Sequence, residues 1–336
     1  MSEQYASPGK RFAIVGAGMA GLACADALVA QGHTVSLFDK ARGPGGRMST
    51  RRVPTDLGDA NFDHGAQYFT ARDPAFQAVV ADWSTRNVAQ PWPPAGEGAW
   101  VGTPGMNAMI RDMAQHHDMH FGCMVQGIAR EGTGWRLMGE GLDDRLFDAV
   151  VVAVPAEQSV SLLGLIDLDM ARQALAARSQ PCWTAMFAFN DPLETDVVVL
   201  RDRGLIGWAS RNSAKPGRKG PEAWVVQANG SWSSDHIELS GADIQDLLLA
   251  ALHDELGTEA APIASAAHRW RYALSAGSGD GALWNSDFNL GVCGDWLLGP
   301  RIECAWLSGN MLADHVAGDR QSSVRSPSKD QEDLVV

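Results

Sequence analysis

The sequence predicts an α/β fold with two lobes, and three features support this prediction. A glycine-rich turn at residues 16–21 separates an apolar run from a helical pattern, and a second apolar run, Asp148–Pro155, is stopped by proline. Between Ala156 and Ser265, helical segments alternate with strands in which polar and apolar residues alternate. Buried runs are typical of parallel sheets, and alternating runs of antiparallel sheets. We therefore expect a Rossmann-type α/β lobe and a second α+β lobe that carries an antiparallel sheet.

The composition narrows the class of protein. The chain has 336 residues, 45% of them hydrophobic, which is enough to bury the cores of two lobes. Its 40 acidic and 27 basic residues give a net charge of −13, which disfavours nucleic-acid binding. Five scattered cysteines without a C-x-x-C pair indicate reduced thiols in a cytoplasmic protein and no metal site. Since no run reaches the roughly 18 apolar residues of a membrane helix, we also expect no association with a membrane.

The glycine turn is typical of a site for a dinucleotide pyrophosphate. It follows a predicted buried strand at residues 12–15 and precedes a predicted helix at 22–31. In the G-x-G-x-x-G spacing, Gly16 allows the tight turn, Gly18 lets the backbone approach phosphate, and Gly21 lets the helix lie close to the strand. The N-terminus of the helix then offers free N–H groups to the anion.

The next segment favours FAD over NAD as the nucleotide. A second predicted strand, 34–38, ends in Asp39, which can accept hydrogen bonds from ribose hydroxyls. After Asp39 the chain enters a loop rich in glycine and arginine, 40–52, where a simple NAD dehydrogenase would begin a helix. In this loop Gly46 and Arg47 can bring backbone amides and a guanidinium to a second face of the pyrophosphate.

Residues 62–72 place Gly65 between a short strand and a polar, aromatic stretch, where a planar ligand often presses on the backbone. His64 is a candidate acid or base. It lacks the second titratable partner that acid–base sites usually show, so we expect it to be a packed or surface residue. Residues 73–102 are predicted to form a helix followed by a loop at 91–100, and residues 105–113 a further helix.

The second lobe is expected to contain strands at Thr184–Phe189 and Ala223–Ala228. Its loops, 208–218 and 229–232, carry tryptophan and arginine together. These side chains could stack on and clamp an aromatic, phosphorylated ligand, or the tryptophans could fill the core. The sequence leaves both interpretations open.

A third element returns to the first lobe. Residues 290–293 are predicted to form a strand that ends at Gly294 and Asp295, and a helix is predicted over 303–315. The positive end of this helix could face the pyrimidine side of a flavin, and Asp295 could accept hydrogen bonds from its ribityl chain. The tail, 319–336, is polar and charged, and we expect it to be disordered.

Taken together, these motifs resemble those of the bacterial renalases, within the amine-oxidase-like flavoproteins. The segments that carry the resemblance are Gly16–Gly21, Asp39, Arg42–Met48, His64–Arg72, Ala209–Arg218, His268–Ala273 and Cys293–Trp296. The resemblance covers residues 10–316. It implies a two-lobe flavoprotein fold, FAD held without a covalent link, and oxidation of the 2- and 6-dihydro isomers of NAD(P)H to NAD(P)+, with oxygen reduced to hydrogen peroxide.

The resemblance also assigns cofactor contacts to eight residues, namely Met19, Asp39, Arg47, Gln67, Tyr68, Val125, Asp295 and Ile302. The complete set that we expect to bind FAD adds Gly16, Gly18, Ala20, Gly21, Lys40, Arg42, Gly46, Met48, Ala66, Pro155 and Gly294. The FAD-binding domain would comprise residues 1–75, 103–155 and 265–318, and the substrate domain residues 76–102 and 156–264.

No side chain is predicted to act as a catalytic acid or base, since a dihydropyridine gains aromaticity when it loses hydride and needs only to be held against the flavin. Candidate contacts to the dinucleotide substrate are Arg72, Trp208, Arg211, Asn212, Trp232 and Tyr272. Among these, we expect Arg211 to clamp the phosphates. An amine oxidase with an aromatic cage and a flavin-binding sensor without catalytic activity remain alternatives.

Overall fold

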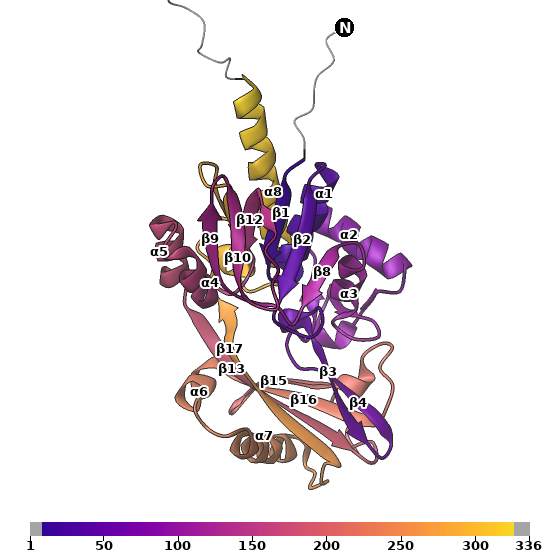
Figure 1. Cartoon of the computed structure of the whole chain (residues 1–336). Helices are drawn as coiled ribbons and strands as arrows, with labels where there is room; N and C mark the ends of the chain where they lie inside the picture. Colours follow the sequence, from indigo (N-terminus) through magenta and orange to yellow (C-terminus); the bar gives the residue numbers. More distant parts are fainter. Residues whose placement is uncertain (1–8, 326–336) are drawn as a thin grey trace, which may run out of the picture.

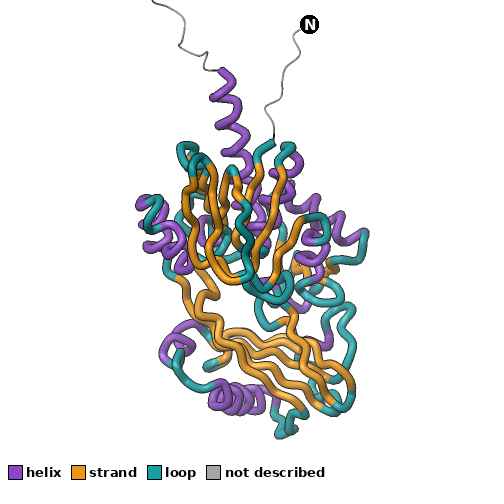
Figure 2. The backbone as a smooth tube through the Cα atoms, in the orientation of Figure 1, coloured by secondary structure: helices purple, strands orange, loops and turns teal. Residues whose placement is uncertain are grey.

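The chain forms two main sheets, each with helices packed against it (Figures 1 and 2). The computed structural model describes residues 9–325, with side chains to residue 319. Figure 1 shows a parallel sheet with its helices at one end of the molecule and a flatter antiparallel sheet at the other. No helix in residues 9–325 has the length and apolar character needed to cross a membrane.

The first sheet has six strands in the order β18-β19-β12-β1-β2-β8. Its strands are β1 (Arg11–Val15), β2 (Thr34–Asp39), β8 (Asp118–Phe121), β12 (Ala149–Val152), β18 (Ala282–Asn285) and β19 (Leu290–Cys293). All neighbours pair in parallel except β18, which runs antiparallel to β19. The central strands are apolar on both sides because both faces of the sheet are covered.

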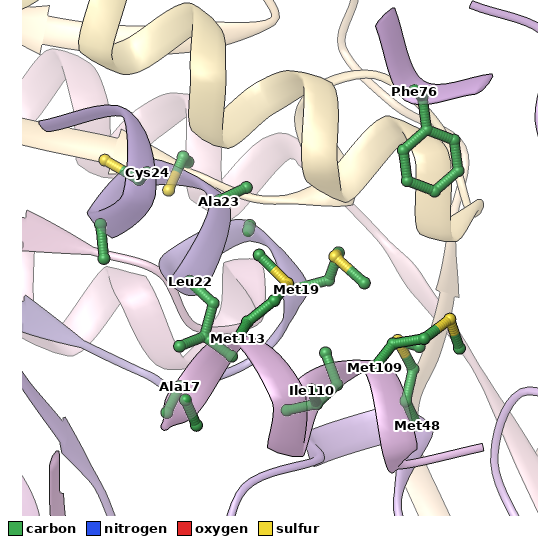
Figure 3. Packing of buried hydrophobic residues seen from close by; sticks show 14 of the residues in the cluster. Ala17, Met19, Leu22, Ala23, Cys24, Met48, Phe76, Met109, Ile110 and Met113 are labelled. Carbon is green, nitrogen blue, oxygen red and sulfur yellow. The ribbon is translucent and has the colours of Figure 1, made fainter. Parts of the chain in front are cut away.

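Alternate residues of β1 divide between two cores. Phe12 and Ile14 face α1 (Met19–Ala30), α2 (Pro74–Thr85), α3 (Ala108–Ala114) and α8 (Ile302–Arg325). Figure 3 shows part of this core around Met19, Leu22 and Met113. Ala13 and Val15 face α4 (Ala156–Leu163), α5 (Leu168–Ala176) and a small sheet. This small sheet consists of β9 (Met124–Glu131), β10 (Gly134–Glu140) and β11 (Leu146–Phe147).

The second main sheet has five antiparallel strands in the order β14-β15-β16-β13-β17. They are β13 (Ser179–Phe189), β14 (Val199–Arg203), β15 (Ile206–Arg211), β16 (Glu222–Ala228) and β17 (Ala264–Ser275). One face packs on α7 (Gly241–Leu256) through Ile244, Leu248 and Leu252. The helix α6 (Gly230–Asp235) lies beside β13. The opposite face, which we call the inner face, is directed toward the residues described below as the candidate site.

A hairpin connects the two parts of the molecule. It consists of β3 (Thr50–Thr55) and β4 (Gly58–Asp63), and it reaches down to the five-stranded sheet in Figure 1. Ala60 and Phe62 of β4 pack against Met186 and Val225 of that sheet. A three-stranded sheet of β5 (Phe69–Thr70), β7 (Ala99–Gly102) and β6 (Ala89–Pro91) completes the fold.

The predicted α/β fold with a second, antiparallel sheet is confirmed, but four boundaries differ from the prediction. Residues 265–275 pair with β13 and so belong to the second sheet, whereas we had placed them in the FAD-binding domain. Residues 76–102 contribute Phe76, Val80 and Trp83 to the core of the first lobe, and not to the substrate domain. The helices at 156–176 also cover the parallel sheet, because their apolar faces fill its second core.

The fourth difference concerns the tail. The helix α8 begins at Ile302 and continues to Arg325, so residues 319–325, which we had predicted to be disordered, are helical. The remainder of the predicted tail lies outside the described residues.

Candidate active site

The glycine turn lies at the carboxyl end of β1, as the sequence predicted. Gly16 has a φ of +108°, and a Cβ there would overlap the carbonyl oxygen of Ala153. A Cβ on Gly21 would overlap the carbonyl oxygen of Gly16, so this glycine sets how closely α1 approaches the strand. A Cβ on Gly18 would meet no atom within 4 Å. Gly18 therefore has the open side that a bound pyrophosphate requires.

Asp39, the last residue of β2, lies beside this turn. One carboxylate oxygen accepts a hydrogen bond from Ala17 N at 2.9 Å, and the other accepts one from Ala41 N at 2.8 Å. A carboxylate offers about four acceptor positions, so two remain for ribose hydroxyls. The backbone thus fixes the orientation of this acid, and the residues of the turn fit a dinucleotide.

Arg47 and Asp295, which we had expected to contact different parts of the cofactor, form an ion pair with each other. The guanidinium of Arg47 donates two hydrogen bonds, of 2.7 and 2.6 Å, to the carboxylate of Asp295, and a third, of 3.1 Å, to Ala273 O. The side chain of Asp295 is only 9% exposed, and that of Arg47 is 34% exposed. The pair joins the loop after β2 to the end of β19.

A third loop, residues 64–68, packs against Arg47. Ala66 N donates a 2.8 Å hydrogen bond to Arg47 O, and a Cβ on Gly65 would overlap that same oxygen. The three segments that the sequence had singled out separately therefore meet at one place.

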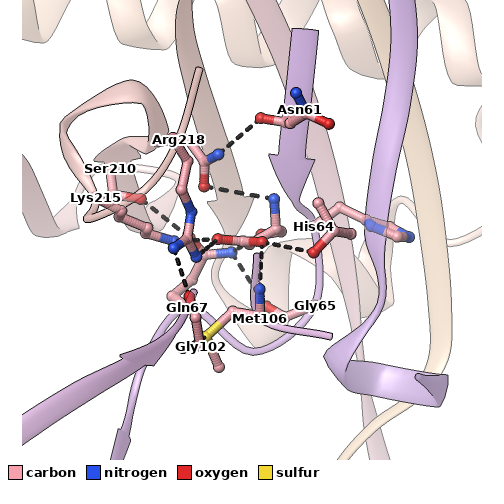
Figure 4. Close-up of polar contacts among 12 residues, drawn as sticks. Asn61, His64, Gly65, Gln67, Gly102, Met106, Ser210, Lys215 and Arg218 are labelled. Atoms are coloured by element: carbon pink, nitrogen blue, oxygen red, sulfur yellow. Dashed lines mark hydrogen bonds and ion pairs between the residues drawn. The ribbon is translucent and has the colours of Figure 1, made fainter. Parts of the chain in front are cut away.

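Both polar atoms of the Gln67 side-chain amide form hydrogen bonds with neighbouring residues. Its Nε2 donates to Gly65 O at 3.1 Å and, through a short contact, to Asp63 O. Its Oε1 accepts from Ser210 Oγ at 3.0 Å and from Lys215 Nζ at 3.1 Å. Figure 4 shows these contacts from β15 and the following loop around the buried amide.

Beneath Gln67 lies a buried ion cluster that the sequence reasoning had not assigned. The carboxylate of Asp63 contacts Arg218 and lies 3.4 Å from Lys215 Nζ, and all three side chains are at most 2% exposed. Thr50 Oγ1 and Met106 N also donate to Asp63 Oδ1, at 2.8 and 2.9 Å. Lys215 and Arg218 lie in one of the segments that carry the resemblance, but nothing local in the sequence identifies Asp63 as their partner.

Burial and charge determine the protonation states in this cluster. Burial alone would raise the pKa of Asp63, but the charges of Lys215 and Arg218 outweigh it and lower that pKa to about 2. Burial, with the charge of Arg218 in the same direction, lowers the pKa of Lys215 to about 8, although Asp63 opposes this shift.

His64 is packed between rings, as expected for a residue without a catalytic partner. Its ring stacks on Trp270 at 5.1 Å and meets His268 edge-on at 5.0 Å, and Trp270 Nε1 donates a 2.8 Å hydrogen bond to His64 O. Burial, followed by the charges of His268 and Arg51, lowers the pKa of His64 to about 4. The imidazole is therefore neutral and a weak base near pH 7.

Three side chains form a stack on the inner face of the five-stranded sheet. The rings of Tyr68 and Trp208 stack at 5.1 Å, and the guanidinium carbon of Arg201 lies 4.7 Å from the Trp208 ring and 5.8 Å from the Tyr68 ring. Tyr68 follows Gln67 directly, so this aromatic stack begins where the three loops meet. Sequence reasoning had identified Tyr68 and Trp208 but had missed Arg201.

Three of the expected substrate contacts lie apart from the aromatic stack. Arg211 points to the opposite face of the sheet, where it lies 2.9 Å from Glu222 and donates to Leu193 O and Thr195 O. Asn212 is buried, and its Nδ2 donates to Asn61 O at 2.7 Å. Trp232 stacks on His236 beside the α7 core.

The remaining residues that we expected to contact the cofactor or the substrate lie in several different elements. Arg72 is exposed and its backbone N–H donates to Glu303, and Tyr272 is half-buried on β17. Lys40 donates to Gln158 at 3.1 Å. Eight further residues lie at or next to the ends of elements: Met19 and Ala20 in α1, Gly46 and Met48 in η1 (Gly46–Met48), Val125 in β9, Pro155 before α4, Gly294 after β19, and Ile302 in α8. Arg42 lies in the loop after β2.

Comparisons with known proteins agree with this geometry. Residues 93–316, two thirds of the chain, match the family model of flavin-containing amine oxidoreductases. The chain belongs to this family. Residues 14–83 match the NAD(P)-binding Rossmann-like domain, which contains the glycine turn and Asp39. The protein is therefore an FAD-dependent oxidoreductase of the amine oxidase type.

Three individual relatives of this flavoprotein share a quarter or less of its sequence. It is 24% identical to renalase of Mus musculus over 293 residues, 78% of this chain and 84% of that protein. Among solved structures, cyclohexylamine oxidase from Brevibacterium oxydans has a TM-score of 0.70 at 14% identity, over 94% of this chain and all of that one. Putrescine oxidase bound to putrescine has a TM-score of 0.63 at 12% identity, over 92% and 99% of the two chains. The flavoprotein is thus renalase-like in sequence and has the fold of amine oxidases.

Proposed function

We propose that this flavoprotein oxidises 2- and 6-dihydro isomers of NAD(P)H to NAD(P)+. The residues that would hold the cofactor are those of the glycine turn with Asp39, and the loops that carry Arg47, Gln67 and Asp295. When bound, FAD would accept the hydride and pass the electron pair to oxygen, giving hydrogen peroxide.

One observation carries the proposal, namely the stack of Tyr68, Trp208 and Arg201. The two aromatic rings and the guanidinium lie against one another, so groups that suit a nicotinamide ring and a phosphate are side by side. A positive charge at this place attracts a substrate with phosphate groups and opposes a protonated amine. The similarity to renalase over 78% of the chain supports the same choice.

The protonation states around the stack are compatible with hydride transfer. A dihydropyridine becomes aromatic when its hydride leaves, so the reaction requires a fixed orientation and no strong base. His64, on the same loop as Tyr68, is a weak base near pH 7 because its pKa is lowered to about 4. The chain's task would then be to orient the donor ring, and Gln67 is immobilised by four hydrogen bonds beside it.

Anaerobic reduction tests the proposal. The holoenzyme is mixed with aged NADPH that contains the dihydro isomers, with fresh NADPH, and with a panel of primary and secondary amines, and flavin absorbance is followed. We expect bleaching by the aged preparation alone, and one hydrogen peroxide per oxidised dinucleotide when air is admitted. Bleaching by an amine would identify an amine oxidase, and bleaching by none of them would indicate a flavin-binding protein without this activity.

A further inference from the structure

We propose that a hollow beside the aromatic stack binds the phosphates of the dinucleotide substrate through Arg201 and Arg203. This inference rests on the proposed function and assigns the anion-binding role to residues other than Arg211. The hollow measures about 460 Å³. Pro93, Pro94 and Gly96 of the η2 turn (Pro93–Ala95) and its C-terminus line one side, and the edge strand β14 lines the other through Val199, Leu200, Arg201 and Arg203.

The register of β14 places Arg201 on the inner face. Arg201 lies opposite Trp208 of β15, and Arg203 lies opposite Ile206. The preceding pair, Leu200 and Ala209, is buried in the core on the α7 side, and so is Ile206. Arg201 therefore shares a face with the aromatic stack. Arg203 lies farther along the β14 edge, where it lines the same hollow and approaches Glu255 of α7.

Arg201 is held in place but keeps most of its hydrogen-bonding capacity. Its Nη2 donates to Ala95 O through a short contact, and its plane lies on Trp208. A guanidinium has five N–H donors in a fixed fork that suits phosphate oxygens. Among the side chains described, no carboxylate forms an ion pair with Arg201. The partner of Arg203 is Glu255, at 4.0 Å.

The charge of the hollow opposes that of the whole chain. The protein carries a net charge of −13, yet this recess presents two cations, and one of them, Arg201, lies on the Trp208 ring. The pyrophosphate of a dinucleotide would be attracted here once its nicotinamide ring reached Tyr68 and Trp208, whereas a protonated amine would be repelled. The arginines would therefore determine specificity without touching the reacting atoms.

The test compares substrates with and without phosphate. The double variant R201Q/R203Q is assayed with dihydro isomers of NAD and with the corresponding isomers of 1-methylnicotinamide, which lack phosphate. Binding of ADP-ribose to the oxidised holoenzyme is measured separately by calorimetry. The matched control is R172Q, because Arg172 is an exposed arginine of α5 whose ion pair is with Asp169.

We expect the double variant to raise KM for the dinucleotide, and the dissociation constant of ADP-ribose, by about ten- to hundredfold. KM for the methyl compound should rise much less than KM for the dinucleotide, and R172Q should leave both at the wild-type values. R201K/R203K, which keeps the charges, should recover part of the affinity.

Two outcomes would overturn the proposal, and a third would overturn the proposed function on which it rests. Equal losses with both substrates would overturn the proposal, because the arginines would then support the rings and not the phosphates. Failure of wild-type holoenzyme to bind ADP-ribose would also overturn it, even if both substrates reduce the flavin. If neither dihydropyridine reduces the wild type, the proposed function fails, and the ADP-ribose measurement still decides whether the hollow binds the anion.

Discussion

Asp63 joins the two lobes through its buried carboxylate. Its carboxylate is buried between two cations, Lys215 and Arg218, and it also accepts hydrogen bonds from Thr50 and Met106 N. Removing one partner of a buried ion cluster leaves the other charges without compensation, which costs more than the cluster itself contributes. Asp63 therefore compensates the charges of the two buried cations beside Gln67.

We expect D63N to lower the free energy of unfolding by about 3–5 kcal/mol. Urea denaturation followed by circular dichroism measures this change. The control is D59N, because Asp59 lies on the same strand with an exposed side chain. Since K215M removes one of the two stranded cations, the double variant D63N/K215M should recover part of the loss. A D63N protein as stable as D59N would contradict this account.

Among the single residues of the site, the sequence predicted those whose role depends on a local sequence pattern. The glycines at 16, 18 and 21 and the acid that follows lie within one strand–helix–strand unit, so their spacing specifies the turn. The pairing of Arg47 with Asp295 joins residues 248 positions apart and follows only from the tertiary fold. Arg211 could have been excluded, since it lies three residues from Trp208 and residues an odd number apart face opposite sides of a strand.

Among the elements, the turn between β1 and α1 has two glycines with different tasks. Gly21 packs against backbone, so the helix cannot keep its position if a methyl group is added there. Gly18 borders open space on the side where the cofactor's pyrophosphate is expected. The two positions therefore separate the stability of the element from its binding function.

We expect G21A to lower the free energy of unfolding by about 1–3 kcal/mol through overpacking. G18A should leave it near the wild-type value, but should raise the dissociation constant of FAD about tenfold or more, since the methyl group would fill space needed by phosphate. Thermal unfolding and fluorescence titration with FAD measure the two effects. If G18A bound FAD like wild type, the cofactor could not lie across this glycine as proposed.

The element least accessible from the sequence is β17. Its residues follow a long helix and precede the strands of the first lobe, so order along the chain suggested the FAD-binding domain. In the structure, β17 pairs with β13 from Ser179–Ser275 to Ala188–Ala264, and this pairing between distant segments decides its place. Alternation identifies a strand, but it does not identify the sheet that the strand joins.

At the scale of the whole molecule, the candidate site lies where the two sheets approach each other, and the β3–β4 hairpin links them (Figure 1). His64 and Asp63 are consecutive residues at the end of this hairpin; burial lowers the pKa of His64, whereas the charges of Lys215 and Arg218 lower the pKa of Asp63 against the effect of burial. Because the pKa values of both groups are lowered in the folded state, acid should weaken the junction through both of them.

We expect stability to fall in two ranges as the pH decreases. His64 has a pKa of about 4 in the folded chain and about 6.5 when unfolded, so the unfolded state binds its proton first, and stability present above pH 6.5 is lost between 6.5 and 4. Protonation of His64 accounts for a loss of up to about 3 kcal/mol in the free energy of unfolding. His268 adds to this loss, because burial lowers its pKa as well. Asp63 contributes below this, as the pH falls from its unfolded pKa of 3.8 toward 2. Calorimetric melting of wild type and H64Q from pH 8 to 3 tests the assignment, because H64Q should flatten only the upper range; an unchanged slope between pH 6.5 and 4 would show that the imidazole is already protonated in the folded protein.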